Sequence, residues 1–169
     1  MSVSVKVFTN VQMASTDFAI LMDAIVPYPN GKGVLTGCQI SRSDASTLAI
    51  TEGWAIVRGR LVHITAGTIS VTHPQTSATK HVVLKVVLSN SDNPGQLTIE
   101  DSVGEDSANF NQSLGTAYLE LATFTVGTSD ISDVVNTAPT GSRHIFVSTA
   151  TPGENDGNDG DLWFVYSNS

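Results

Sequence analysis

The sequence of 169 residues contains one cysteine, Cys38, so an intrachain disulfide is excluded. The four histidines are scattered along the chain, and none forms a recognisable pattern with Cys38 that would supply a base for a catalytic thiol. Ile40 follows two residues later in the same apolar-flanked stretch. We therefore predict that Cys38 is a small buried hydrophobic residue.

Basic residues are also few: 8 Lys and Arg stand against 16 Asp and Glu, for a net charge of −8. A chain of that charge repels phosphate backbones and anionic lipid headgroups, so we expect no nucleic-acid partner. Long apolar runs are missing as well, because no segment approaches the roughly 18 residues of a membrane span. Residues 1–10 lack a basic start followed by an apolar run. We expect neither a secretion signal nor membrane insertion.

Motifs for catalysis are absent. The chain has no Gly-x-Ser-x-Gly, no phosphate-binding loop and no His-Glu-x-x-His. The paired carboxylates Glu100-Asp101 and Glu105-Asp106 are adjacent in sequence, a spacing that does not specify the acid and base of a glycosidase. The sequence therefore predicts a protein that is not an enzyme and needs no cofactor.

The sequence does contain the alternating segments and regularly spaced turns that are typical of β-strands. Residues 52–64 read as two short strands around a turn at Gly59, and turn signals recur about every ten residues from Val34 to Ser129. The apolar run Val82–Leu88 predicts a central strand, paired with Gln96–Glu100. The polar segment 104–113 predicts a mobile loop. These patterns predict a mainly β fold: an antiparallel β-sandwich with a short N-terminal helix in an arm and a C-terminal β-hairpin.

We divide the chain into an N-terminal arm with a short helix (1–33), a β-sandwich domain (34–136) and a linker with a C-terminal β-hairpin (137–169). The arm opens with Val3, Val5 and Val7 on one face and Ser4, Lys6 and Phe8 on the other, as in a strand. A short helix follows, whose apolar residues are too numerous for it to stand alone. We expect an interface at its helically spaced side chains, Phe18, Leu21, Met22 and Ile25.

The C-terminal region has two aromatic-rich segments, Ile145–Thr149 and Leu162–Tyr166. An isolated two-stranded hairpin is marginal in water, so either the main domain or further copies of the chain must bury its aromatic residues. The expected interface residues are Phe146, Trp163, Phe164 and Tyr166.

The connection between those segments is acidic, and Asp156, Asp159 and Asp161 offer oxygens of the kind that calcium prefers. The spacing of an EF-hand is not met, and Asn, Asp and Gly are the residues that any long turn favours. We therefore predict a turn and no metal site, with these three residues as weak candidates.

Three further side chains admit alternatives. Trp54 alternates with its neighbours inside a predicted strand, which favours a core position over a sugar-stacking platform. Arg58 and Arg60 flank the turn at Gly59 and are predicted to face solvent or a partner subunit.

The order of these segments resembles the baseplate and tail-fibre adaptor proteins of tailed bacteriophages, including the N-terminal domains of upper-baseplate and receptor-binding proteins. The resemblance covers roughly residues 15 to 136. It rests on six segments in the same order. They are a short helix (17–26), a segment with glycine at both 33 and 37 (33–41), the predicted hairpin and the residues before it (47–62), a long apolar strand (81–88), a strand with aromatic residues (118–126) and a closing segment (131–135). Residues 145–166 are separately similar to hairpins of phage fibre proteins and to the trimerising hairpin of phage fibritin.

Two positions depart from that family. Thr79-Lys80-His81 stands where an Asp-Arg pair usually precedes the apolar strand, and Val135-Asn136 stands where the closing segment usually ends in Asp and Arg. An interface built on that arginine is therefore not carried over.

The resemblance implies a structural component of the virion, located in a tail, baseplate or neck. It would attach fibres or other virion structural proteins through its N-terminal arm and form a homo-oligomer, with a trimer favoured. The alternative is a receptor-binding module for a host-surface saccharide, bound through loops such as 104–113.

Overall fold

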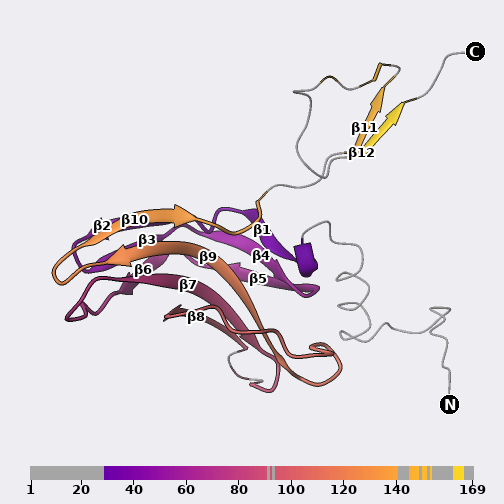
Figure 1. Cartoon of the computed structure of the whole chain (residues 1–169). Coiled ribbons are helices and arrows are strands. Elements are labelled where there is room, and N and C mark those ends of the chain that lie inside the picture. The colour runs from indigo at the N-terminus through magenta and orange to yellow at the C-terminus, as the bar shows by residue number, and fades with distance from the viewer. Residues whose placement is uncertain are drawn as a thin grey trace, which may run out of the picture.

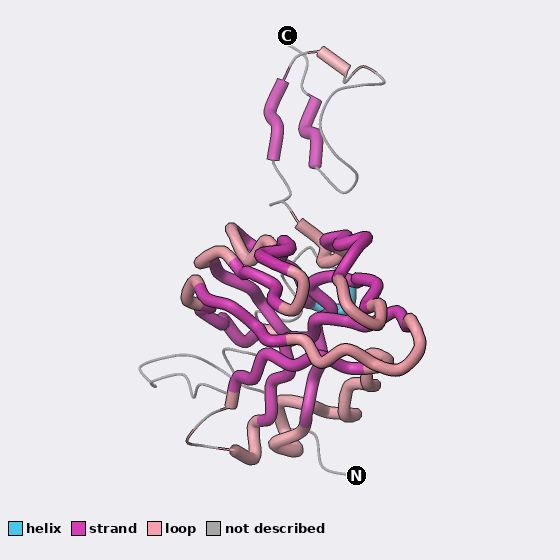
Figure 2. The backbone as a smooth tube through the Cα atoms, turned by 90° about the vertical axis from the view of Figure 1, so that its left-hand side faces the viewer, coloured by secondary structure: helices cyan, strands magenta, loops and turns pink. Residues whose placement is uncertain are grey.

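The structure of the chain is a computed structural model, and it confirms the predicted mainly β, sandwich-like fold (Figure 1). It describes residues 29–90, 92, 94–140, 145–148, 150, 151, 153 and 162–165. Within them, the helical structure is one short turn, η1 (Pro29–Gly31), and strands make up most of the body (Figure 2). The predicted N-terminal helix lies outside the described residues.

One sheet has the order β1-β4-β5 and contains the predicted hairpin. Its strands are β1 (Lys32–Thr36), β4 (Gly53–Val57) and β5 (Arg60–Ile64). Val57 pairs with Arg60, which leaves a two-residue turn of Arg58 and Gly59. Both turn residues have positive φ, 49° and 77°, as in the primed turns whose twist matches that of antiparallel strands. Gly59 therefore determines where this hairpin reverses.

A second three-stranded antiparallel sheet lies in the order β2-β3-β6, formed by β2 (Ile40–Asp44), β3 (Thr47–Ile50) and β6 (Gly67–Ser70). The third sheet has four antiparallel strands in the order β10-β9-β7-β8. They are β7 (Ala78–Val87), β8 (Gly95–Glu100), β9 (Thr116–Val126) and β10 (Ile131–Asn136). The pairing of β7 with β8 confirms the partner predicted for the apolar run.

The hydrophobic core lies between the four-stranded sheet and the two three-stranded sheets. Leu48 and Val57 come from the three-stranded sheets, and Leu84, Leu121 and Phe124 come from the four-stranded sheet. Each of these five side chains is at most 2% exposed. Burial of side chains this size contributes roughly 1.5–3 kcal/mol each, so this cluster is the main source of stability.

One lateral seam between the layers is closed by hydrogen bonds. The backbone N–H of Ile40 in β2 donates to Oδ1 of Asn136 in β10 (2.8 Å), and Nδ2 of Asn136 donates back to the Ile40 carbonyl (3.0 Å). Farther along, the Val34 N–H in β1 donates to the Pro139 carbonyl (2.8 Å). We call the contacts of Val34, Ile40, Asn136 and Pro139 the closed seam. It runs beside β10 and β2, which lie next to each other in Figure 1.

The C-terminal strands differ from the predicted hairpin. β11 (Ile145–Ser148) and β12 (Leu162–Val165) pair in parallel, with Phe146 opposite Trp163. A hairpin requires antiparallel strands, so this part of the prediction is wrong. The physical reason is the long connection, residues 149–161, because a link of about a dozen residues is enough for the chain to return and enter the second strand from the same end.

Candidate functional site

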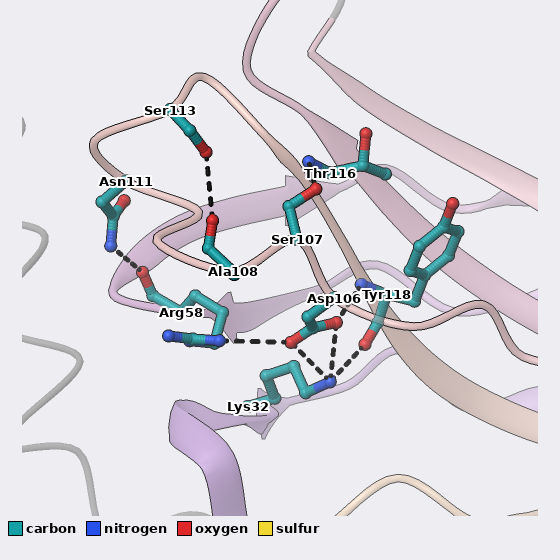
Figure 3. A network of polar contacts seen from close by, with 9 residues as sticks. All are labelled: Lys32, Arg58, Asp106, Ser107, Ala108, Asn111, Ser113, Thr116 and Tyr118. Atoms are coloured by element: carbon teal, nitrogen blue, oxygen red, sulfur yellow. Dashed lines mark hydrogen bonds and ion pairs between the residues drawn. The ribbon is translucent and has the colours of Figure 1, made fainter.

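The loop between β8 and β9 was a candidate saccharide site, and its central carboxylate is bound internally (Figure 3). Nζ of Lys32 lies 3.0 and 3.1 Å from the two oxygens of Asp106 and donates to the Tyr118 carbonyl at 2.8 Å. The Tyr118 N–H donates to Asp106 Oδ1 at 3.0 Å, and a guanidinium nitrogen of Arg58 lies 3.5 Å from Oδ2. Asp106 therefore joins this loop to β1, to β9 and to the β4–β5 turn.

The tip of the same loop is also anchored. Phe110 is 0% exposed and lies in the core. Asn111 is buried, accepts a hydrogen bond from Nε of Arg60 (2.9 Å) and donates one to the Arg58 carbonyl (2.9 Å). The prediction of a mobile loop is wrong, because a buried aromatic side chain and a paired amide bind it to the sandwich.

The same contacts correct the prediction for the two turn arginines. Arg58 and Arg60 are partly buried and face the 101–115 loop. Burial lowers the pKa of the Arg60 guanidinium from its ordinary value. These cations therefore hold the loop in place: Arg58 lies beside the Asp106 carboxylate, and Arg60 bonds the uncharged amide of Asn111.

Opposite the closed seam, the sandwich opens in an apolar cleft of about 630 Å³. It is bordered by the edge strands β5 and β6 of the three-stranded sheets and by the edge strand β8 of the four-stranded sheet. We call this the open cleft. Its lining includes nine branched aliphatic side chains: Ile50, Leu61, Val62, Ile64, Ile69, Leu84, Val86, Leu88 and Leu97. Sequence pattern predicted β5 and β8 and did not indicate that the edges of β5, β6 and β8 converge.

The side of the β1-β4-β5 sheet that points away from the core carries exposed apolar side chains. We call this side the outer face. Trp54 is 40% exposed and Leu61 is 60% exposed, whereas Ile56, which pairs with Leu61, is buried. Leu35 is 42% exposed at the irregularity in β1 beside them. The core position predicted for Trp54 is wrong, because the core-facing side of this strand is taken by Ala55.

Trp54 belongs to a small aromatic cluster. Its ring stacks on His63 in the neighbouring strand, with centroids 4.4 Å apart and planes inclined by 30°. Nε2 of His63 lies 2.9 Å from Oε1 of Glu52. An exposed indole beside an imidazole and a carboxylate is an arrangement that can stack on a sugar ring and bond its hydroxyl groups.

A second histidine lies where three loops meet. Oγ of Ser46 is 2.9 Å from Nε2 of His73, and Nδ1 of His73 is 2.8 Å from the Gly127 carbonyl. In the tautomer whose Nδ1–H donates to that carbonyl, Nε2 accepts a hydrogen bond from the Ser46 hydroxyl, as in a serine–histidine pair. The open cleft does not include these residues, and the arrangement links the three loops.

The buried position predicted for Cys38 is confirmed. The residue is 2% exposed, and burial raises the pKa of its thiol above the ordinary 9.0. A high pKa keeps the sulfur protonated and unreactive, which fits a packing role.

Most of the predicted site residues are not tested by these contacts. Phe18, Leu21, Met22, Ile25, Tyr166 and the acidic residues Asp156, Asp159 and Asp161 lie outside the described residues. Phe146, Trp163 and Phe164 lie on β11 and β12, where the structure describes the backbone pairing. Within the described part of the chain, no group of three or more His, Cys, Asp or Glu side chains is arranged to hold a metal ion. No helix among those residues is long and apolar enough to span a membrane.

Comparison with known proteins finds no protein-family model and no curated protein that matches the chain.

Proposed function

We propose that the protein is a non-enzymatic structural component of a bacteriophage virion, in a tail, baseplate or neck. It attaches fibres or neighbouring proteins through its N-terminal arm and forms a homo-oligomer, with a trimer favoured. The supporting sequence feature is the resemblance of residues 15–136 to baseplate and tail-fibre adaptors. The structural observation that carries the proposal is the outer face, where Leu35, Trp54 and Leu61 are each at least 40% exposed on one sheet.

Apolar side chains exposed side by side are characteristic of contact surfaces between proteins. In a symmetric assembly, every copy offers the same face to a neighbour, so modest contacts are repeated around the axis. The polar groups nearest this face are already paired: His63 contacts Glu52, and Asp106 is used by Lys32 and Arg58. This combination suits burial against a neighbour more than chemistry on a substrate.

The test for assembly is the solution mass of the full chain beside a form ending at Ser142, measured by light scattering at several concentrations. A trimeric full chain and a monomeric short form would assign self-association to the C-terminal segments. A full chain carrying Leu61→Ser tests the outer face, and Leu114→Ser, at a similarly exposed leucine in the 101–115 loop, is its matched control. A monomer in every form would contradict self-association.

The virion role has a separate test. Tailed particles produced from a genome that encodes this chain would be labelled with an antibody raised against residues 29–140. Discrete label at one level of the tail, baseplate or neck is expected. Particles that carry no label and no copy of the chain by mass spectrometry would contradict the proposal, whatever the solution mass.

A host-surface saccharide-binding module is the second candidate, and the cluster of Trp54, His63 and Glu52 is the observation that favours it. Binding of the full chain to a panel of bacterial surface glycans would be compared with that of Trp54→Ala and Glu52→Gln. A glycan that the parent binds and that Trp54→Ala binds clearly more weakly would support this function. Loss of stacking on one ring weakens binding by about 1 kcal/mol, or roughly fivefold.

A further inference from the structure

Among the strands that the structure describes, β5, β6 and β8 are edges of their sheets, and all three border the open cleft, β5 and β6 on one side and β8 on the other. Unpaired edges present rows of backbone N–H and C=O groups that can pair with another strand, and proteins usually protect them with lysine, proline or bulges. These three strands contain no lysine or proline, and their only Asp, Glu or Arg residues are Arg60 and Glu100 at the ends. All six residues of β8 are half-buried, although it is an edge strand. The cleft therefore has the form of an acceptor for one more strand.

The interior of the open cleft decides which side chains such a strand must carry. Val62 and Ile69 come from one layer and Leu84 and Leu97 from the other, and all four border a space of about 630 Å³. A strand that enters it needs small or branched apolar residues on one face, because successive side chains point to opposite sides. Its other face meets solvent and can be polar. In strand addition, the main chain supplies hydrogen bonds and the alternate side chains supply specificity.

We propose that the chain's own N-terminal segment, Ser2–Phe8, fills the open cleft as an added strand beside β8. Val3, Val5 and Val7 lie at every second position and are the apolar face that the cleft requires. Ser2, Ser4 and Lys6 lie on the opposite face, which would meet water, and the apolar Phe8 ends the segment on that same face. The segment contains no proline or glycine, so each residue can pair and none interrupts the strand.

The place where the described chain begins supports this occupant. The Arg58 N–H donates to the Gly31 carbonyl (3.0 Å), so the chain enters the sandwich beside the β4–β5 turn. Arg60, two residues later, already lines the open cleft. Residues 9–28 connect Phe8 to the described chain. When extended, they span about 3.3 Å per residue, or roughly 66 Å in total, whereas neighbouring strands are roughly 4.8 Å apart. A segment tethered so close has an effective concentration of about millimolar, which favours the same chain over a second copy.

The other end of the described body does not compete for the cleft. Pro139 accepts a hydrogen bond from Val34 in β1, and Val34 forms a parallel bridge with Thr140. β1 is the edge of its sheet opposite β5. The described chain also enters beside β1, but Gly31 lies at the end of β1 next to the β4–β5 turn, whereas Pro139 contacts Val34, which is two residues farther from that turn than Lys32. The segment before Gly31 is therefore the nearer one to Arg60, which lines the cleft.

This inference goes beyond the proposed virion function and does not depend on it. It divides the N-terminal arm into two parts with different roles. Ser2–Phe8 becomes a strand of the fold, and the helically spaced apolar residues of 18–25 are left for the contact with a neighbouring protein that the proposed function assigns to the arm.

The test places a nitroxide spin label on Ser4→Cys in the full chain, because Ser4 is on the face predicted to meet solvent and Cys38 is buried. Amide resonances of β5 and β8 should broaden most strongly. A 1:1 mixture of spin-labelled, isotopically unlabelled protein with ¹⁵N-labelled protein lacking the nitroxide should show none of this broadening. Broadening at β8 in the mixture as well as in the fully labelled sample would assign the strand to a second copy and overturn the proposal, and so would no broadening at β8 in either sample.

Two variants make the assignment specific to the valine face. Val3→Ser, Val5→Ser and Val7→Ser combined in the spin-labelled chain should abolish the broadening and speed hydrogen exchange at the β8 amides at least tenfold. The matched control carries Ser2→Thr and Lys6→Gln on the opposite face and should retain the parent behaviour. The β9 amides report whether each variant is folded. Equal β8 exchange in the triple variant and the control would overturn the proposal, and so would retained broadening in the triple variant.

Discussion

The two lateral seams of the sandwich show two solutions to the same problem. At the closed seam, the Asn136 side chain bonds both backbone groups of Ile40, and Val34 bonds Pro139, so the two layers are joined by hydrogen bonds. At the opposite side, the edges of β5, β6 and β8 border an apolar cleft. The difference teaches that a side chain can join two sheets whose strands do not pair, whereas an unjoined seam exposes core residues and invites a further strand.

The anchored loop between β8 and β9 is the third element of this comparison, because it covers one end of the sandwich. Phe110 fills the core there and Asp106 collects three donors above it. This end of the sandwich is therefore closed both by the buried ring of Phe110 and by the ion pairs and hydrogen bonds of Asp106. The open cleft has no comparable closure among the described residues.

The largest effect is expected from the core anchor of the loop. Phe110→Ala should lower the free energy of unfolding by about 3–5 kcal/mol, because it removes a fully buried ring and leaves a cavity. Urea denaturation followed by tryptophan fluorescence measures it. Leu114→Ala, in the same loop but 58% exposed, should stay within about 0.5 kcal/mol of the parent. Equal losses in both variants would contradict the anchoring role of Phe110.

The polar anchor comes second. Asp106→Ala should cost about 2–3 kcal/mol, because Lys32 and the Tyr118 N–H lose a charged partner in a partly buried position. Glu105→Ala, at the exposed neighbouring position, is the control and should change stability by less than about 0.5 kcal/mol. Thermal unfolding of both variants measures the difference in stability. An Asp106→Ala variant as stable as Glu105→Ala would show that the network is dispensable.

The closed seam should respond more weakly. Asn136→Ala removes both hydrogen bonds to Ile40 and should cost about 1–2 kcal/mol. Asn136→Asp keeps an acceptor for the Ile40 N–H and loses the donor to its carbonyl, so an intermediate loss is expected. Val135→Ala, at a neighbouring residue that is 55% exposed, serves as the control in the same denaturation series. If Asn136→Ala matched Val135→Ala, the seam would be held by packing alone.

The smallest effect is a pH dependence at Cys38. Burial raises the pKa of the folded thiol above 9.0, so the unfolded chain releases the proton first as the pH rises. The stabilising contribution of the protonated thiol is full below pH 9.0 and is lost as the pH rises through the folded pKa. The difference in unfolding free energy between the parent and Cys38→Ala should therefore be smaller at pH 10 than at pH 8. A constant difference across that range would mean that the thiol keeps its ordinary pKa.

Local pattern was sufficient to predict the hairpin of β4 and β5, the central strand β7 and its partner β8, and the burial of Cys38. These features depend on neighbours that are close in sequence: Gly59 supplies a turn, and the β7–β8 connection brings two apolar runs together. The mainly β class followed from the same regularities. An alternating strand pattern shows that two faces differ, however, and does not identify which face is buried, as Trp54 and Ala55 demonstrate.

The seams, the anchored loop and the parallel pairing of β11 with β12 depend on contacts between residues far apart in the chain. Asp106 meets Lys32, Asn111 meets Arg60 and Asn136 meets Ile40 only after the sheets have packed. A polar loop has the same composition whether it is free or bound, because its partners are set by sheet order and register. The sequence by itself therefore determined where strands and turns form. Which side chains pair, which face of a strand is exposed and in which direction β11 and β12 run were decided by the packing of the layers.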